Sequence, residues 1–261
     1  METDKKYKLT DECITIGDKK LYRIESLKDF AFIKKGDKGG FVESEENLSQ
    51  VGSCWIYNDA KVSGDTKVCG DAQVYGNACV FGDAWVIGDA KVYGNTKVYG
   101  NACVFGDAEI YGNAQVSGDA RVCGNARVYD NARVYGDAKV CGDARVYGNA
   151  MVYGNAEVFG NVHIKGDADI SSISDYIFFK NWWSSGRCFT WTRSNNMWSV
   201  GCFYGTGEEL IAKAYKDSEI SGKEYELVVK YVESILKDGN TTTIVNKIKQ
   251  RLIKIIKKFN L

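Results

Sequence analysis

Between Ile56 and Asp169 the chain repeats one six-residue phrase nineteen times, with no insertion or deletion. The phrase is aliphatic–x–Gly–Asp/Asn–Ala/Thr–x, where x is variable. Because side chains of a strand alternate between its two sides, the Ala/Thr and the aliphatic residue two places later point to one side. Gly followed by Asn or Asp suits a corner, since these residues tolerate positive φ. Each phrase therefore predicts a short strand and a bend, and the uninterrupted period predicts a solenoid.

The residue after the aliphatic position shows that three phrases make one coil. Read at every eighteenth residue, this position gives one column of six successive tyrosines, whereas the other two columns mix aromatic residues with Ser, Ile and Cys. The tyrosine column consists of Tyr57, Tyr75, Tyr93, Tyr111, Tyr129 and Tyr147. The corner that follows it carries mostly Asn, and the other two corners carry mostly Asp. The sequence therefore predicts 18 residues per coil and a triangular prism with three distinct faces.

This repeat resembles the left-handed parallel β-helix of hexapeptide-repeat proteins, and the left hand is what the resemblance implies. The segments 21–24, 28–30 and 39–49 resemble the start of uncharacterised hexapeptide-repeat proteins of phages, prophages and bacteria. Members are often labelled as transferases or polymer-forming proteins, and the resemblance implies no established activity. Such β-helix proteins are usually homotrimers, which predicts subunits packed side by side.

The two ends of the repeat predict further elements, because stacked coils need caps at their open ends. We expect a mainly β protein with an N-terminal β cap at 1–55, the β-helix at 56–170, a small α+β domain at 171–239 and a terminal helix at 240–261. The α+β domain is expected to hold strands at 175–179, 187–192 and 198–203, followed by a helix that starts at a capping box, Thr206-Gly207-Glu208-Glu209. A second helix is expected from Ser221. Its expected apolar face comprises Val228, Tyr231, Val232 and Ile235.

The terminal helix, expected over about 242–259, has one apolar stripe and one basic side. The stripe consists of Val245, Ile248, Leu252, Ile255 and Phe259. The opposite side carries six Lys or Arg residues and no acid. Three interpretations stay open: a helix docked on its own domain, an oligomerisation helix that associates across subunits, or contact with an anionic partner.

Composition narrows the function classes. Lys plus Arg and Asp plus Glu are both 34, so the net charge argues against nucleic acid as a partner. The start of the chain lacks an apolar signal region and no long apolar run follows, which predicts a cytoplasmic protein without a membrane span. The nine cysteines lack CxxC spacing, and we expect free thiols, although Cys123 and Cys141 stack one coil apart.

Two functions from different classes remain. Many left-handed β-helix proteins are acyl-CoA-dependent acyltransferases that use a histidine base; the only histidine here is His163, on the outer side of the last coil. No loop leaves the coils to enclose an acyl donor, so the leading hypothesis is a non-enzymatic oligomeric scaffold without cofactor or metal, acting as a phage accessory factor. In that hypothesis it binds or sequesters a host component, for instance a defence protein or a nucleotide. The tyrosine column is then either a binding and oligomerisation face or a stack that holds the coils in register.

Overall fold

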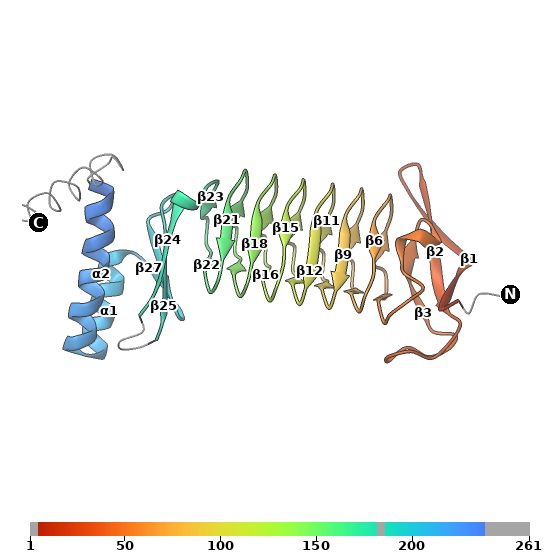
Figure 1. Cartoon of the computed structure of the whole chain (residues 1–261), viewed down its shortest axis with the longest axis horizontal. Helices are drawn as coiled ribbons and strands as arrows, with labels where there is room; N and C mark the ends of the chain where they lie inside the picture. Colours follow the sequence, from red (N-terminus) through yellow and green to blue (C-terminus); the bar gives the residue numbers. More distant parts are fainter. Residues whose placement is uncertain (1–4, 182–185, 238–261) are drawn as a thin grey trace, which may run out of the picture. The chain divides into compact units, whose positions relative to one another are not determined.

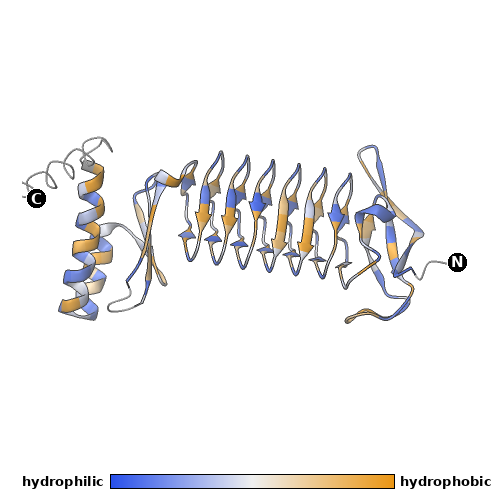
Figure 2. Ribbon diagram, in the orientation of Figure 1, coloured by the Kyte–Doolittle hydropathy of each residue, from blue (hydrophilic) through white to orange (hydrophobic). Residues whose placement is uncertain are grey.

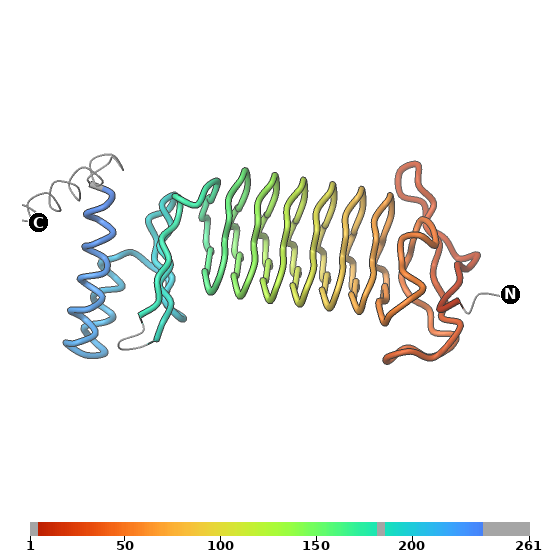
Figure 3. Tube along the Cα trace, viewed as in Figure 1, coloured from red at the N-terminus to blue at the C-terminus, as the bar shows by residue number. Residues whose placement is uncertain are grey.

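The computed structural model describes residues 5–181 and 186–237. The chain divides into two compact units, 1–202 and 203–261. The first unit contains about seven turns of a parallel β-solenoid, which Figure 3 shows as stacked coils without excursions. Paired strands are 18 residues apart, so the predicted coil length and the three faces are confirmed.

Each face of the solenoid is one parallel sheet. The tyrosine face consists of β4 (Trp55–Ile56), β7 (Gln73–Val74), β10 (Lys91–Val92), β13 (Glu109–Ile110), β16 (Arg127–Val128), β19 (Arg145–Val146) and β22 (His163–Ile164). The cap face consists of β5 (Lys61–Val62), β8 (Cys79–Val80), β11 (Lys97–Val98), β14 (Gln115–Val116), β17 (Arg133–Val134), β20 (Met151–Val152) and β23 (Asp169–Ile170). The Trp85 face consists of β6 (Lys67–Val68), β9 (Trp85–Gly88), β12 (Cys103–Gly106), β15 (Arg121–Val122), β18 (Lys139–Cys141) and β21 (Glu157–Phe159).

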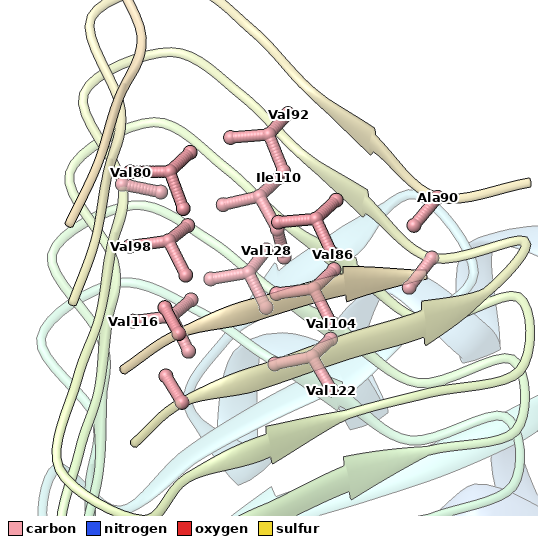
Figure 4. Packing of buried hydrophobic residues seen from close by; sticks show 14 of the residues in the cluster. Val80, Val86, Ala90, Val92, Val98, Val104, Ile110, Val116, Val122 and Val128 are labelled. Atoms are coloured by element: carbon pink, nitrogen blue, oxygen red, sulfur yellow. The ribbon is translucent and has the colours of Figure 1, made fainter. Parts of the chain in front are cut away.

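The core is a narrow column of small aliphatic side chains that the three faces share. The Val or Ile of every phrase is buried, and so is the residue two places before it, which is Ala in most phrases. Figure 4 shows valines from the three faces pointing toward one another inside the coils, and Figure 2 shows the matching alternation of hydrophobic and hydrophilic positions along the coils. At roughly 0.8 kcal/mol per buried CH₂, this repeated burial stabilises every coil in the same way.

The corners require glycine because successive coils approach closely there. A Cβ added to Gly94, which has φ +79°, would lie 2.8 Å from the carbonyl oxygen of Gly112 in the next coil. Two corners depart from the phrase: Asn58 and Asp130 stand in the glycine position and adopt φ 53° and 58°. Asn and Asp are among the few residues that tolerate this left-handed conformation.

The N-terminal cap continues one face of the solenoid. The antiparallel hairpin of β1 (Tyr7–Ile16) and β2 (Lys19–Ser26) is followed by β3 (Lys38–Val42), which pairs in parallel with β5 of the cap face. The 3₁₀ turn η1 (Glu45–Asn47) and β4 complete this first, irregular coil. Parallel stacking therefore begins before Ile56, within the segment expected to form only a cap.

At the other end, the expected strands are present as β24 (Tyr176–Lys180), β25 (Cys188–Thr192) and β26 (Met197–Val200), after the 3₁₀ turn η2 (Ile173–Asp175). They form an antiparallel sheet in the same compact unit as the coils (Figure 1). The hydroxyl of Tyr176 donates to the carbonyl oxygen of Glu157, at 2.8 Å, and so ties this sheet to the last coils.

The second unit contains β27 (Phe203–Gly205), α1 (Gly207–Asp217) and α2 (Glu219–Lys237). The predicted capping box of α1 is confirmed, with Thr206 and Glu209 bonding each other's backbone amides. The predicted start of α2 is wrong, and its predicted apolar face is confirmed for Val232 but wrong for Tyr231. The helix starts at Glu219, and its buried side carries Tyr225, Val229 and Val232, whereas Tyr231 is 65% exposed.

Candidate functional site

The tyrosine face carries a ladder of stacked rings. Tyr75, Tyr93, Tyr111, Tyr129 and Tyr147 lie one above the next, with ring centroids 4.6–5.0 Å apart and ring planes within 7° of parallel. Each ring therefore uses both faces on its neighbours and presents its edge and hydroxyl outward. The stacking alternative predicted for this column is confirmed; a binding role for the same tyrosines stays a prediction.

Both ends of the ladder are closed by other groups. Tyr57 meets Tyr75 edge-on, with centroids 6.3 Å apart. At the opposite end the ammonium of Lys165 lies 5.6 Å from the centre of the Tyr147 ring, and the His163 ring meets that tyrosine edge-on. A flat ligand, such as a nucleic-acid base, thus finds no open ring face along the ladder. The favourable contacts of the rings are already made within the chain.

A second ladder of side-chain amides follows the adjacent corner. Asn77 donates its amide hydrogen to the carbonyl oxygen of Asn95, and the same bond recurs from coil to coil at 3.0–3.2 Å. The series runs through Asn113, Asn131 and Asn149 and ends on the carboxylate of Asp167. A side-chain amide can donate one hydrogen bond and accept another, so the series continues from coil to coil. It ends at Asp167, because a carboxylate only accepts.

Partial burial within the ladder changes the acidity of the tyrosines. It raises the pKa of Tyr93 to about 12, with the Glu109 carboxylate adding to the effect. It also raises the pKa of Tyr129 to about 12, where the neighbouring tyrosines add. The ladder hydroxyls are therefore protonated at neutral pH and present hydrogen-bond donors rather than charges.

His163 lies on the outer side of β22, beside the antiparallel sheet. Its backbone amide donates to the hydroxyl of Thr190 at 3.2 Å. Burial lowers the pKa of its imidazole, and the charges of Arg145 and Lys165 lower it further. The structure thus gives this histidine two cationic neighbours. In a typical histidine-base arrangement, by contrast, a carboxylate orients the histidine ring, and the ring is hydrogen-bonded to a nucleophile.

The Trp85 face exposes large apolar side chains that the sequence analysis did not single out. Trp85 is 47% exposed, Phe105 38% and Phe159 43%. Ile87 pairs with Phe105 in the same outward column. The signal was present in the sequence, because this column contains only Cys, Ile and Phe, but the regular tyrosine column dominated the interpretation.

The expectation of free thiols is wrong for one pair of cysteines. Cys123 and Cys141 form a disulfide between adjacent coils, with Cα atoms 4.6 Å apart. Their identical position in successive coils brings them this close, since the coil spacing matches the Cα separation of a disulfide. The remaining cysteines among the described residues are free.

Several expectations concern residues or ligands beyond these surfaces. The apolar stripe Val245, Ile248, Leu252, Ile255 and Phe259 lies outside the described residues. Within residues 5–181 and 186–237, no group of three or more His, Cys, Asp or Glu side chains is arranged to hold a metal ion. None of the helices in these ranges is long and apolar enough to cross a bilayer.

Comparison with known families supports the coils alone. The family model of the YdcK beta solenoid repeat matches residues 72–88, 114–128, 120–136, 126–142, 138–154 and 144–166. These segments all lie within the solenoid and together make up less than half of the chain. No curated protein matches the sequence. In its coils, the chain is therefore similar to the YdcK β-solenoid repeat.

Proposed function

We propose that this protein is a non-enzymatic scaffold, whose solenoid presents rigid faces to other macromolecules and to further copies of itself. The observation that carries the proposal is the outer surface of the coils. There, stacked rings and bonded amides hold each coil in register with the next. Surface groups are thus fixed relative to one another over many coils, and preordered groups lose little conformational entropy on binding.

We further propose that the Trp85 face is the contact between subunits, in a homotrimer. Its exposed Trp85, Phe105 and Phe159 are aromatic, which is the chemistry enriched at protein interfaces. The strands at its apolar part, β9 and β12, are paired over four residues instead of two, so this part of the face is extended and flat. A flat apolar surface suits the side-by-side packing of identical rods.

Light scattering coupled to size exclusion tests the oligomer. The wild-type chain is expected at three times the chain mass, and Trp85→Lys and Phe105→Lys are expected to shift it toward the monomer. The matched control is Phe32→Lys, which makes the same chemical change at a side chain that is 92% exposed in the cap. A monomeric wild type, or a shift in Phe32→Lys as large as in the two other variants, contradicts the proposed contact.

The alternative is an acyl-CoA-dependent acyltransferase with His163 as the base. One observation favours it: the lowered pKa keeps the imidazole neutral at physiological pH, which a general base requires. A titration of wild type and His163→Ala with acetyl-CoA separates the two functions. Specific binding that is lost in His163→Ala would overturn the scaffold proposal, whereas equal or absent binding in both proteins supports it.

The partner proposed for the scaffold follows from the resemblance of the N-terminal segment to phage-associated proteins. It is a cytoplasmic host component, such as a defence protein or its nucleotide signal. Affinity capture from a host lysate tests this, with mass spectrometry for proteins and nucleotides. A component retained by wild type and lost in a surface variant of the solenoid supports the proposal. Identical recovery with wild type and variants contradicts it.

A further inference from the structure

A groove of about 460 Å³ lies where the hairpin β1–β2 meets the cap face. Its apolar lining comes from the hairpin and from the second coil, through Ile16, Leu21, Val80 and Phe81. Two of these side chains keep much of their surface open inside the groove: Ile16 is 46% exposed and Phe81 37%. A volume of this size falls in the range of small-molecule sites, which are concave and mostly apolar with a few polar groups.

The polar groups of this groove are chiefly ammonium ions. Lys61, Cys79 and Lys97 occupy the same outward position in three successive coils, so the two lysines flank the thiol from either side along the sheet. The ammonium of Lys61 donates to a backbone carbonyl oxygen, that of Asp59, at 2.8 Å. Among the described residues, neither Lys61 nor Lys97 forms an ion pair. Both keep an uncompensated positive charge at the edge of an apolar surface.

The third lysine of the groove differs from these two. Lys19 pairs with the carboxylate of Glu43 at 2.8 Å, and the same carboxylate accepts a hydrogen bond from the backbone amide of Gly64. This ion pair fixes the end of the hairpin against the cap face. The Lys19–Glu43 pair therefore belongs to the lining of the groove, and the unpaired positive charge that the described residues offer a ligand comes from Lys61 and Lys97.

We propose that this groove binds a free single-chain amphiphile with a carboxylate head, of the medium-chain fatty-acid class. The carboxylate lies between Lys61 and Lys97, which supply charge-assisted hydrogen bonds. The hydrocarbon tail covers the open surfaces of Ile16 and Phe81, and so removes apolar area from water on both molecules. A cationic amphiphile of the same length meets like charge at the head position. This inference is independent of the scaffold proposal.

Cys79 lies between the two lysines and provides a direct reporter. The internal control is Cys202, an exposed free cysteine that lies outside both the groove and the proposed subunit contact. The thiol of Cys79 lies 3.6 Å from the carbonyl oxygen of Asn77. The intact protein is treated with iodoacetamide with and without decanoate, below its aggregation concentration, and the modification rate of each cysteine is read by peptide mass spectrometry.

Saturating decanoate is expected to slow alkylation of Cys79 at least fivefold and to leave the rate at Cys202 unchanged. Decylamine is expected to leave both rates unchanged. Lys97→Glu is expected to weaken the protection by decanoate about tenfold in concentration, because it replaces an attraction at the head by a repulsion. Lys91→Glu is the control, since Lys91 has the same position in the phrase on the tyrosine face. Circular dichroism establishes that each variant folds, and Lys97→Gln replaces Lys97→Glu if that variant does not.

Four results would overturn the proposal. Equal protection by decylamine means that the lysines do not select the head. Equal slowing at Cys79 and Cys202 means a general surface association rather than a site. Unchanged protection in the Lys97 variant means that the carboxylate lies elsewhere. Protection of Cys79 by inorganic phosphate without decanoate would likewise replace the amphiphile by a simple anion.

Discussion

Two threonines replace alanine inside the coils, and their different surroundings give a matched prediction. Thr66 and Thr96 are both fully buried. The hydroxyl of Thr66 donates to the carbonyl oxygen of Ser63 at 2.9 Å and lies 3.3 Å from that of Gly82. The hydroxyl of Thr96 has no hydrogen-bond partner among the described residues. Replacement by valine, which has nearly the same shape, therefore removes a satisfied hydroxyl in one case and an unsatisfied one in the other.

The expected changes in free energy of unfolding have opposite signs. A buried polar group without a partner costs about 1–3 kcal/mol, so Thr96→Val is expected to stabilise the protein by about 1–2 kcal/mol. Thr66→Val removes the hydroxyl that donates a hydrogen bond to the carbonyl oxygen of Ser63. This variant is expected to destabilise the protein by about 1 kcal/mol. Both substitutions keep the volume of the core, because valine replaces the hydroxyl by a methyl group.

Amide hydrogen exchange measures the change locally, which suits a solenoid whose coils contact only their neighbours. The reporters are the amides of Lys97 and Lys67, which donate to the next coil beside the two threonines. In Thr96→Val, a gain of about 1–2 kcal/mol in stability slows exchange of the Lys97 amide about 5–30-fold. In Thr66→Val, the loss of stability speeds exchange of the Lys67 amide. Urea unfolding followed by tryptophan fluorescence gives the global change. If both valine variants shift stability in the same direction, the difference in hydroxyl satisfaction does not control stability and the reasoning fails.

Three further predictions concern His163, the tyrosine ladder and the disulfide. Burial lowers the pKa of the His163 imidazole below its ordinary value of about 6.5, so the unfolded state takes up a proton at a higher pH than the folded state. The free energy of unfolding therefore falls as the pH drops below about 6.5. His163→Gln is expected to remove this difference, measured by urea unfolding at pH 5.5 and 7.5. Tyr93 and Tyr129 ionise near pH 12, so an ultraviolet titration of the native protein shows tyrosines that ionise well above about pH 10, and a single transition at that value contradicts the burial of the ladder. Reduction of the disulfide Cys123–Cys141 lowers the free energy of unfolding by up to about 3 kcal/mol, from the entropy of an 18-residue loop; an unchanged urea midpoint in dithiothreitol refutes a bridged native state.

The period of the sequence sufficed to predict the coils, because each coil contacts the residues one period away. The tyrosine column placed Tyr111 against Tyr93 and Tyr129, and stacking followed from that placement. The stripe of α2 shows where pattern reasoning failed. Val228 and Val229 both belong to apolar stripes of α2, and the packing of α1 against α2 decided that Val229 is the buried one. In this contact between the helices, the ring of Tyr215 from α1 occupies the space that a Cβ on Gly222 of α2 would need.

The sequence by itself determined the solenoid, its three faces, the buried column, and the columns of Tyr and Asn residues that lie one above the next. A strictly local repeat encodes every contact that recurs at 18 residues. The tertiary structure alone decided which contacts form between non-repeating parts: the hairpin against the cap face, the two cationic neighbours of His163, and the groove beside Cys79. These contacts depend on how the β1–β2 hairpin and the antiparallel sheet are oriented against the coils. No periodicity within a single segment fixes that orientation.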